Sequence, residues 1–461
     1  MLPSGTVMLA IPPGLMRWIF GIALAVSLLV MGCNGPDSRA RGSIKAGDEA
    51  AQQRALREAL NHYRTAAVAE PASLEAQMRR GAMAELLGEF DEALDAYGRA
   101  SRLHASGLAY YRAGAMADRM GNTALATEYL NASLQAPPTR GERWAQTGQQ
   151  SIERLTLSLN GSRWGRMLPD WVFRSLHASR VVLANAVLDR EVVAAALFTT
   201  LLEAGESERA LEVARGRGWV RAGADYCAAA RGAVGAETRA LVGMLAAPER
   251  ADCLLPLGRA LTDAGLVRLS RLVLQDQIRR APDVRARREA EAFLRYRLPA
   301  HDVPKIAESL NIAAYNLQHR FGDQGAAATA YQKAIAADPK FSWPYANLGR
   351  LYMELDQYDL AVDWLGTAIR INPNHFRAHA NLGVALQTLR RYDEAVGAYR
   401  AALALNPDDA STQANLGRSL LSLGRDAEGL RALQTAVRLD PSLEEERELL
   451  TRRLAGGFRL D

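Results

Sequence analysis

Small and apolar residues recur at helical spacing in the C-terminal part of the chain, and the pattern returns with a fixed period. A phrase of the form Ala-x-x-x-Asp/Asn-Pro ends at four prolines that are 34 residues apart, namely Pro339, Pro373, Pro407 and Pro441. A helical hairpin of this length cannot bury its apolar face alone, so the period predicts hairpins that stack on one another. Alignment on the prolines gives the units 308–341, 342–375, 376–409 and 410–443.

Small residues occupy equivalent positions in these units. They let two helices approach closely, so we expect them where the two helices of a hairpin cross. Only the first unit departs from the pattern, with Tyr315 at its eighth position. The residue before each proline is pushed out of the α region, so the second helix should end there. The small residues are Gly349, Gly383 and Gly417 at position 8, Ala327, Ala361, Ala395 and Gly429 at position 20, and Ala334, Ala368, Ala402 and Ala436 at position 27.

The four units resemble the tetratricopeptide repeat (TPR). This resemblance implies an all-α fold, a right-handed α-solenoid of TPR-type helical hairpins. The composition agrees, because strong helix formers are abundant and aromatic residues make up only 7% of the chain.

Weaker copies of the unit precede the regular ones. The clearest covers residues 74–107, where a Gly-Glu-Phe-Asp-Glu-Ala phrase is followed by Tyr97. The open end of a solenoid must face water, so the polar residues near the C-terminus predict a capping helix. In chain order we predict a signal peptide (1–33), a tether (34–47), an N-terminal TPR block (48–140) that opens with an incomplete unit, an irregular helical joint (141–190), a degenerate TPR-like region (191–307), the four regular units (308–443), and a capping helix with a tail (444–461).

The N-terminus carries a candidate export signal. Arg17 precedes an apolar run over residues 18–31, which has the length of a signal-peptide core and falls short of the roughly 20 residues that a membrane span needs. The run leads into Val-Met-Gly-Cys33, which resembles the lipobox of bacterial lipoproteins and implies cleavage before Cys33 and acylation of its thiol. Residues 1–15 lack a positive charge, so we expect translation to start at Met16.

An acylated Cys33 would hold the protein on a lipid bilayer, because two or more acyl chains anchor stably where a single chain does not. The lipoprotein resemblance therefore implies a protein of the bacterial cell envelope that faces the periplasm. In that family an Asp after the Cys favours the inner membrane, so Asn34 favours the outer membrane over the inner one. Residues 34–47 are polar and contain Gly, Pro and Ser, which predicts the flexible tether.

The remaining cysteines are Cys227 and Cys253. An oxidising compartment permits a disulfide between them, and their spacing fits neighbouring helices of a solenoid. Two buried free thiols are the alternative, since free cysteine is common at small apolar positions. We predict no metal site and no cofactor, because the chain has no CxxC motif and its histidines are scattered. His375 and His379 are four residues apart, but His375 is predicted to lie in a turn.

The charge balance argues against a nucleic-acid partner. The net charge is only +5, and the basic excess lies in the middle of the chain without interleaved aromatic residues. We interpret it as a solvated helix face, with an acidic partner or an anionic lipid as the alternative. The chain also lacks a Gly-rich phosphate loop, an HExxH motif and a GxSxG motif, so we predict no catalytic residues and no enzymatic activity.

Candidate binding residues lie on the first helices of the regular units. The sixth residue is Asn347, Asn381 and Asn415 in three consecutive units. A side-chain amide offers an acceptor and two donors, so it can pair with the backbone of an extended peptide of any sequence. This row resembles the peptide-binding surface of the repeat domain in O-linked N-acetylglucosamine transferases. The alternative is that Asn-Leu-Gly is simply frequent in such repeats.

Three further residues complete the predicted binding surface. Arg350 and Arg418 lie three residues after an asparagine of the row, almost one helical turn away, where each can pair with an acidic group. Trp343 can serve as an apolar anchor for a partner, or it can pack against the turn at Pro339.

Together these patterns predict a membrane-anchored scaffold or assembly factor of the bacterial envelope. It would bind envelope proteins or extended peptides on the inner surface of the repeats. Lipoproteins with such repeats resemble pilotins, exopolysaccharide-export partners and outer-membrane assembly components. The first alternative is a periplasmic holdase or maturation factor of the cytochrome c assembly type. The second is a glycan-active enzyme, which would need a cleft with perturbed carboxylates.

Overall fold

The described part of the chain is helical. Short turns connect the helices, and these residues form no strand. The fold is an all-α solenoid of TPR-type hairpins, in agreement with the prediction from the sequence. The computed structural model describes residues 38–104, 106–138, 188–220, 254–280 and 284–443, together with residues 241, 242, 244, 245, 448, 449 and 452.

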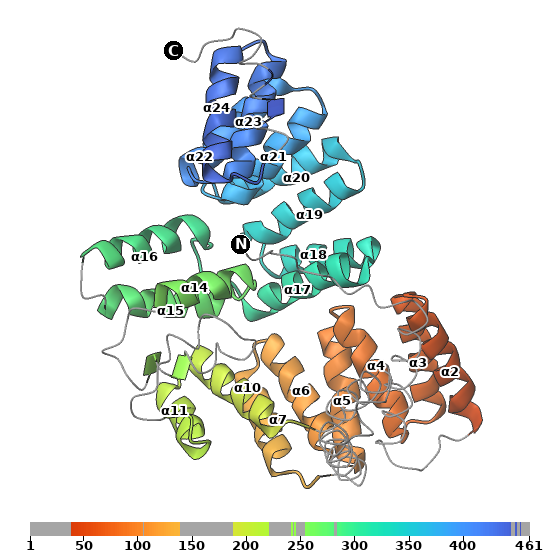
Figure 1. Cartoon of the computed structure of the whole chain (residues 1–461). Coiled ribbons are helices and arrows are strands. Elements are labelled where there is room, and N and C mark those ends of the chain that lie inside the picture. Colours follow the sequence, from red (N-terminus) through yellow and green to blue (C-terminus); the bar gives the residue numbers. More distant parts are fainter. Residues whose placement is uncertain are drawn as a thin grey trace, which may run out of the picture. The chain divides into compact units, whose positions relative to one another are not determined.

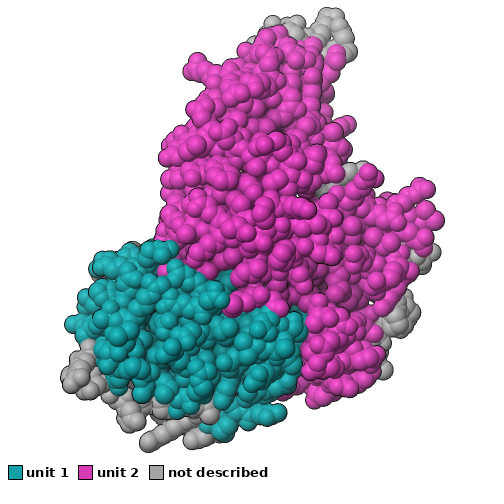
Figure 2. All heavy atoms as spheres, turned by 180° about the vertical axis from the view of Figure 1, so that it is seen from behind, with its two compact units in different colours: residues 1–85, 89–118, 122–200 teal, residues 86–88, 119–121, 201–461 magenta. Residues whose placement is uncertain are grey.

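The chain divides into two compact units, which Figure 2 shows in two colours. Unit 1 comprises residues 1–85, 89–118 and 122–200, and unit 2 comprises residues 86–88, 119–121 and 201–461.

Unit 1 consists of three helical hairpins followed by the start of a further helix (Figure 1). Its helices are α2 (Ser38–Gln52), α3 (Leu56–Ala69), α4 (Leu74–Leu86), α5 (Phe90–His104), α6 (Gly107–Arg119) and α7 (Thr123–Gln135), and α10 (Arg190–Glu203) continues into unit 2.

The first hairpin corrects two predictions. The tether predicted over 34–47 is helical from Ser38 onward, and the incomplete first unit is a full hairpin of α2 and α3. Arg41, Lys45 and Glu49 of α2 are exposed, whereas Ala40 and Ile44 are buried against α3. The TPR block therefore begins at residue 38, not 48. The sequence pattern did not reveal this helix, because a helix with only one buried face has a composition that resembles a linker.

Unit 2 begins with irregular hairpins and ends with regular ones, which Figure 1 shows stacked from α17 to α24. Its irregular part contains α11 (Ser207–Gly216), α14 (Leu254–Asp263), α15 (Val267–Arg280) and α16 (Val284–Arg297). The regular part contains α17 (Lys305–Asn316), the π-helical turn η2 (Leu317–Phe321), α18 (Gln324–Ala337), α19 (Ser342–Glu354), α20 (Tyr358–Ile371), α21 (Phe376–Thr388), α22 (Tyr392–Leu405), α23 (Ala410–Ser422) and α24 (Asp426–Leu439).

In seven of the described hairpins, a glycine on the first helix packs against a large side chain 16 residues later. A Cβ atom on Gly349 would lie 2.5 Å from Leu365 Cγ, and one on Gly417 would lie 2.8 Å from Leu433 Cγ. Real Cβ atoms do not approach other atoms this closely, so a larger residue at either position would force the helices apart. The predicted role of these glycines is confirmed. The same pairing occurs at Gly47 and Tyr63, Gly81 and Tyr97, Gly114 and Leu130, Gly258 and Leu274, and Gly383 and Tyr399.

The π-helical turn explains the departure at Tyr315. The turn adds one residue after α17, so the small residue that faces the second helix is the fully buried Ala314 and not Tyr315. Tyr331, which is also fully buried, follows Ala314 by 17 residues instead of 16. Tyr315 is 46% exposed and occupies the position that Arg350 has in the next repeat. The predicted unit 308–341 is therefore one residue out of register before the turn.

The second helices end at the Asp/Asn-Pro pairs, as predicted. Asp338 and Asn372 have extended backbone angles, and their N–H groups donate to the carbonyl oxygens of Ala334 and Ala368. The side chain of Asp338 accepts a hydrogen bond from the N–H of Lys340 at 3.0 Å, which fixes the turn after the proline. These bonds set the angle at which each repeat leads into the next.

A hydrophobic cluster joins the irregular hairpins to the regular repeats within unit 2. It combines Val267, Leu274 and Ala290 of α15 and α16 with the fully buried Phe341, and Trp343 packs against it. The cluster fixes α16 beside the start of α19. This position makes α16 one wall of a groove in unit 2.

Candidate functional site

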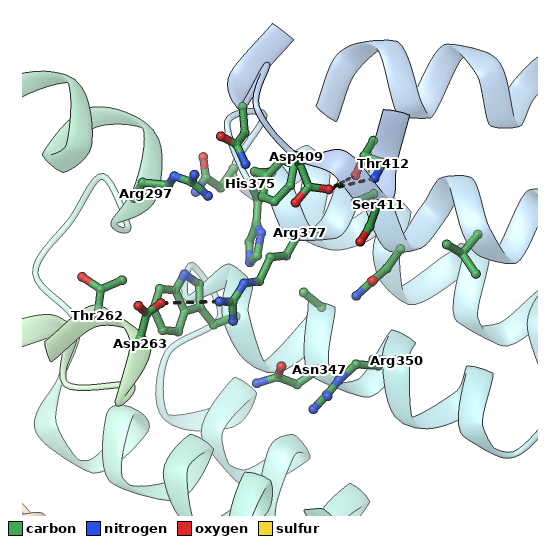
Figure 3. Close-up of a pocket in the computed structure, with 18 of the residues that line it drawn as sticks. Thr262, Asp263, Arg297, Asn347, Arg350, His375, Arg377, Asp409, Ser411 and Thr412 are labelled. Atoms are coloured by element: carbon green, nitrogen blue, oxygen red, sulfur yellow. Dashed lines mark hydrogen bonds and ion pairs between the residues drawn. The ribbon is translucent and has the colours of Figure 1, made fainter. Parts of the chain in front are cut away.

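Unit 2 contains a groove with a volume of about 950 Å³ (Figure 3). One wall is formed by the first helices of the regular repeats, α19, α21 and α23, together with the turns that precede α21 and α23. The opposite wall is formed by α14 and α16, with Tyr315 of α17 between them. We call this cavity the unit 2 groove.

The three predicted asparagines all line the unit 2 groove. Asn347, Asn381 and Asn415 lie on α19, α21 and α23, and each is partly exposed. The Nδ2 atom of Asn347 donates to Asn311 Oδ1 at 2.9 Å, which fixes the orientation of its amide. Within the described residues, the amides of Asn381 and Asn415 have no hydrogen-bond partner. Their donors and acceptors are therefore available to a ligand.

Arg350 also lines the groove, but it is already engaged by neighbours. Its guanidinium lies over the Tyr315 ring, 5.4 Å from the ring centroid, and contacts His319 Nε2. Burial, followed by the positive charge of Arg350, lowers the pKa of His319, so His319 is neutral beside the arginine. Arg418, the equivalent residue two repeats later, does not line the groove. The structure therefore brings together five of the six predicted binding residues.

Trp343 packs against the hydrophobic cluster at Phe341 and also lines the groove. Its ring stacks near that of Phe341, with centroids 6.0 Å apart and planes inclined by 27°, and it packs against the cluster that holds α16. It also lines the groove, where its ring centroid is 6.4 Å from that of His375. Trp343 is part of the core and part of the groove wall.

His375 caps the N-terminus of α21 and so lies in the turn before the helix, as predicted. Its Nδ1 atom accepts a hydrogen bond from the N–H of Ala378 at 3.3 Å, so the ring proton is on Nε2. Burial lowers the pKa of His375 to about 4, and the nearby Arg377 adds to the effect. His379 Nε2 lies 2.9 Å from the carbonyl oxygen of Pro373. In the described part of the chain, no group of His, Cys, Asp or Glu side chains is arranged to hold a metal ion.

Two arginines on the opposite wall were not predicted. Arg259 of α14 lies over the ring of Phe293, 5.7 Å from its centroid, and Arg297 of α16 lies over the ring of Phe376, 5.0 Å from its centroid. Burial lowers the pKa of Arg297, and the charge of Arg377 adds to this effect. Neither arginine forms an ion pair or a hydrogen bond within the described residues.

An ion pair joins the two walls. Arg377 Nη2 lies 3.5 Å from Asp263 Oδ1, and both side chains are 72% exposed (Figure 3). Asp409 also lines the groove, and it begins α23 by accepting a hydrogen bond from the N–H of Thr412 at 2.9 Å. The groove thus has carboxylates at the start of α23 and unpaired guanidinium groups on α14 and α16.

No pattern in the sequence marks Arg259 and Arg297 as residues of the groove. Arg259 and Arg297 lie in irregular hairpins that share no register with the asparagine row, and the chain has many arginines. Phe376 opens a regular repeat, but its equivalents in the neighbouring repeats are Ser342 and Ala410, so the repeat pattern does not mark it either.

Unit 1 has a second groove, of about 610 Å³, which we call the unit 1 groove. Its charges neutralise one another. Arg64 Nε donates to Glu92 Oε1 at 2.9 Å, and Arg80 Nε donates to the same oxygen at 2.7 Å. Arg80 also reaches Asp95, which in turn pairs with Arg99. The hydrogen bond from Arg64 is the largest of the effects that lower the pKa of Glu92 to about 2.

Several predicted features lie outside the described residues. They are the signal peptide, the candidate lipidation site Cys33, the cysteines Cys227 and Cys253, and most of the segments 141–190 and 444–461. No helix in the described ranges combines the length and the apolar character needed to span a membrane.

Comparison with protein families finds tetratricopeptide repeats in this chain. A family model described as "Tetratricopeptide repeat" matches residues 44–107, 346–410 and 384–444. The first match begins within α2, in agreement with a first hairpin of α2 and α3. No curated protein matches the chain.

Solved structures of TPR proteins share local similarity with the chain. One described as "Crystal structure of MamA" is 24% identical, covers 30% of this chain and 82% of its own, and has a TM-score of 0.29. A second MamA structure, labelled AMB-1, is 26% identical, covers 43% and 97%, and has a TM-score of 0.27. A third, "Crystal structure of YrrB: a TPR protein with an unusual peptide-binding site", is 17% identical, covers 46% and 96%, and has a TM-score of 0.29.

Proposed function

We propose that the protein is an interaction scaffold of the bacterial envelope that binds an extended peptide segment of a partner protein in the unit 2 groove. The observation that carries this proposal is the position of Asn347, Asn381 and Asn415 in one groove, each on the first helix of a consecutive repeat. The TPR repeats found in the chain support it, because this kind of hairpin array offers a continuous surface to an extended ligand.

Side-chain amides at regular intervals suit a peptide backbone. Each peptide unit presents one N–H donor and one C=O acceptor, and an asparagine side chain can satisfy either of them. Asn381 and Asn415 have no partner within the described residues, so a peptide would not have to displace an existing bond at those two positions. Binding through the backbone would tolerate many sequences, and other groups in the groove would then select among them.

The membrane anchor is part of the proposal. Acylation at Cys33 would tie the scaffold to the bilayer and raise the local concentration of the groove near other envelope proteins. The lipobox-like Val30-Met31-Gly32-Cys33 supports this. An anchor of this kind would hold the scaffold at the periplasmic face, preferentially at the outer membrane.

A crosslinking capture from membranes tests both parts. The wild-type chain is compared with a Cys33→Ala variant and with a triple variant in which Asn347, Asn381 and Asn415 are replaced by Ala. A matched control replaces three threonines of the second helices whose hydroxyls bond only to their own helix, Thr329, Thr367 and Thr435.

We expect a small set of envelope proteins to be captured by the wild type and the threonine control, and to be lost in the asparagine variant. Cys33→Ala should move the protein from the membrane fraction to the soluble fraction. Capture of the same set by the asparagine variant would contradict the role of the groove. Weak capture of many unrelated extended peptides would instead favour a holdase.

A further inference from the structure

The wall of the unit 2 groove that the regular repeats do not build carries two arginines of its own. Arg259 and Arg297 line the groove from α14 and α16, opposite the asparagine row. They combine positive charge and aromatic support, and neither forms a hydrogen bond or an ion pair within the described residues.

Stacking on a ring holds a guanidinium group without using its donors. The Cζ atoms of Arg259 and Arg297 lie over the rings of Phe293 and Phe376, and the N–H donors of both arginines form no hydrogen bond within the described residues. The planar edge therefore stays available for a bidentate bond to a carboxylate. Asp263 and Asp409 act on Arg297 at a distance, but neither forms an ion pair with it, and Asp263 pairs with Arg377.

Burial disfavours the charge on Arg297. Partial burial and the positive charge of Arg377 act against the charge on Arg297, whereas Asp263 and Asp409 act in its favour, and the balance lowers the pKa of Arg297. A carboxylate from a ligand would relieve this repulsion in a site that is only partly hydrated, where a charge-assisted bond is stronger than in water. The carboxylates that line the groove, apart from Asp263, belong to Asp408 and Asp409 in the turn before α23.

We propose that Arg259 and Arg297 select an acidic side chain, Asp or Glu, in the segment that the asparagine row holds. This inference rests on the peptide-binding function proposed above and adds a specificity to it. The repeats bind the backbone of the ligand, and Arg259 of α14 and Arg297 of α16 bind its acidic side chain.

Fluorescence anisotropy with labelled peptides tests the inference on the full chain without its signal peptide. The probes are serine/alanine peptides that carry two central aspartates, two central asparagines or two central lysines. The variants are Arg259→Gln, Arg297→Gln and Arg259→Glu. The control is Arg287→Gln, which removes the same charge from an exposed position of α16 that does not line the groove.

We expect the wild type and Arg287→Gln to bind the aspartate peptide at least about fivefold more tightly than the asparagine peptide. Arg259→Gln and Arg297→Gln should each reduce this preference. Arg259→Glu should shift the preference toward the lysine peptide, a gain that a loss of folding cannot mimic. Because Arg297 also contacts Phe376, the binding data for Arg297→Gln are compared with its thermal unfolding curve, which shows whether the variant is folded.

Equal binding of the aspartate and asparagine peptides by the wild type would overturn the inference, as would a preference that Arg259→Gln and Arg259→Glu both leave unchanged. The asparagine triple variant separates this failure from a failure of the proposed function. If all peptides bind alike and the triple variant loses them, only the charge selection is wrong. If no peptide binds, or the triple variant binds as well as the wild type, the peptide-binding function itself is wrong.

Discussion

The two grooves are built from the same kind of hairpin but use their arginines in opposite ways. In the unit 1 groove, Arg64 and Arg80 share Glu92, and the remaining charges pair along the same network. In the unit 2 groove, Arg259 and Arg297 lie over phenylalanine rings and form no ion pair within the described residues. The number of arginines in a groove therefore says little about its affinity for anions.

What differs is whether the positive charge is already satisfied. A guanidinium group that forms a bidentate bond with a carboxylate of its own fold has little left to offer a ligand, and its pairing stabilises the unit. A guanidinium that is held by a ring keeps its donors, at some cost to stability. The charges of the unit 1 groove therefore serve the structure, whereas those of the unit 2 groove suit recognition.

The largest effect should come from the scaffold that both grooves share. A Cβ atom on Gly81 would lie 2.7 Å from Tyr97 Cε1, and one on Gly349 would lie 2.5 Å from Leu365 Cγ. We expect Gly81→Val and Gly349→Val each to lower the free energy of unfolding by about 3 kcal/mol. Urea denaturation followed by circular dichroism measures both.

The control is Gly366→Ala on α20, the partner helix of α19, where a Cβ atom would meet nothing within 4 Å. It should raise the free energy of unfolding by about 0.5–1 kcal/mol, because Ala is a better helix former than Gly. If Gly349→Val lowered the free energy of unfolding but Gly81→Val did not, close helix packing at this glycine would not be a shared feature of the two units.

A smaller effect is expected from the network of unit 1. Glu92 is only 16% exposed, and its pKa is lowered to about 2 from an unfolded value of 4.5, first by the hydrogen bond from Arg64. Its ionised form thus stabilises the fold above about pH 4.5, and this stabilisation is lost as the pH falls toward 2. Glu92→Gln should lower the free energy of unfolding at pH 7 by about 1–2 kcal/mol, after allowance for solvent screening.

The difference between Glu92→Gln and the wild type should shrink when the urea titration is repeated near pH 2.5. Glu128→Gln, at an exposed position of α7, serves as the control and should have almost no effect at either pH. If Glu92→Gln lowered the free energy of unfolding by the same amount at both pH values, the shape of this side chain, and not its charge, would account for its role.

The smallest effect is expected from the ion pair that joins the walls of the unit 2 groove. Arg377 and Asp263 are both 72% exposed, so their mutual interaction should contribute only about 0–0.5 kcal/mol. A double-mutant cycle with Arg377→Gln and Asp263→Asn measures it by urea denaturation. A coupling energy well above 1 kcal/mol would indicate that this pair, and not the hydrophobic cluster at Phe341, holds the walls together.

The repeat-derived part of the site could be predicted from the sequence because the repeats share one register. A position that faces the groove in one repeat faces it in the next, so the 34-residue period alone is enough to group Asn347, Asn381 and Asn415 on one surface. The same register failed at Tyr315, where the π-helical turn adds one residue. A single inserted residue inside a helix leaves no mark in a pattern aligned on the prolines that follow it.

The opposite wall could not be predicted, because its position depends on tertiary packing. Arg297 lies beside Phe376 only because α15 and α16 share a hydrophobic cluster with Phe341. Nothing local to Arg297 reports that contact. The helix α2 was missed for a related reason, since its few buried residues are spread among polar ones that resemble a linker.

The cluster at Phe341 also bears on how the molecule unfolds. In a linear array each hairpin touches only its neighbours, so fraying that starts at one end passes from hairpin to hairpin. Phe341 and Trp343 add contacts beyond the neighbouring hairpin, because they pack the start of α19 against residues of α15 and α16. Melting that begins at α24 should therefore proceed inward and stall at α19, which makes this junction the slowest-exchanging boundary of unit 2 in hydrogen exchange.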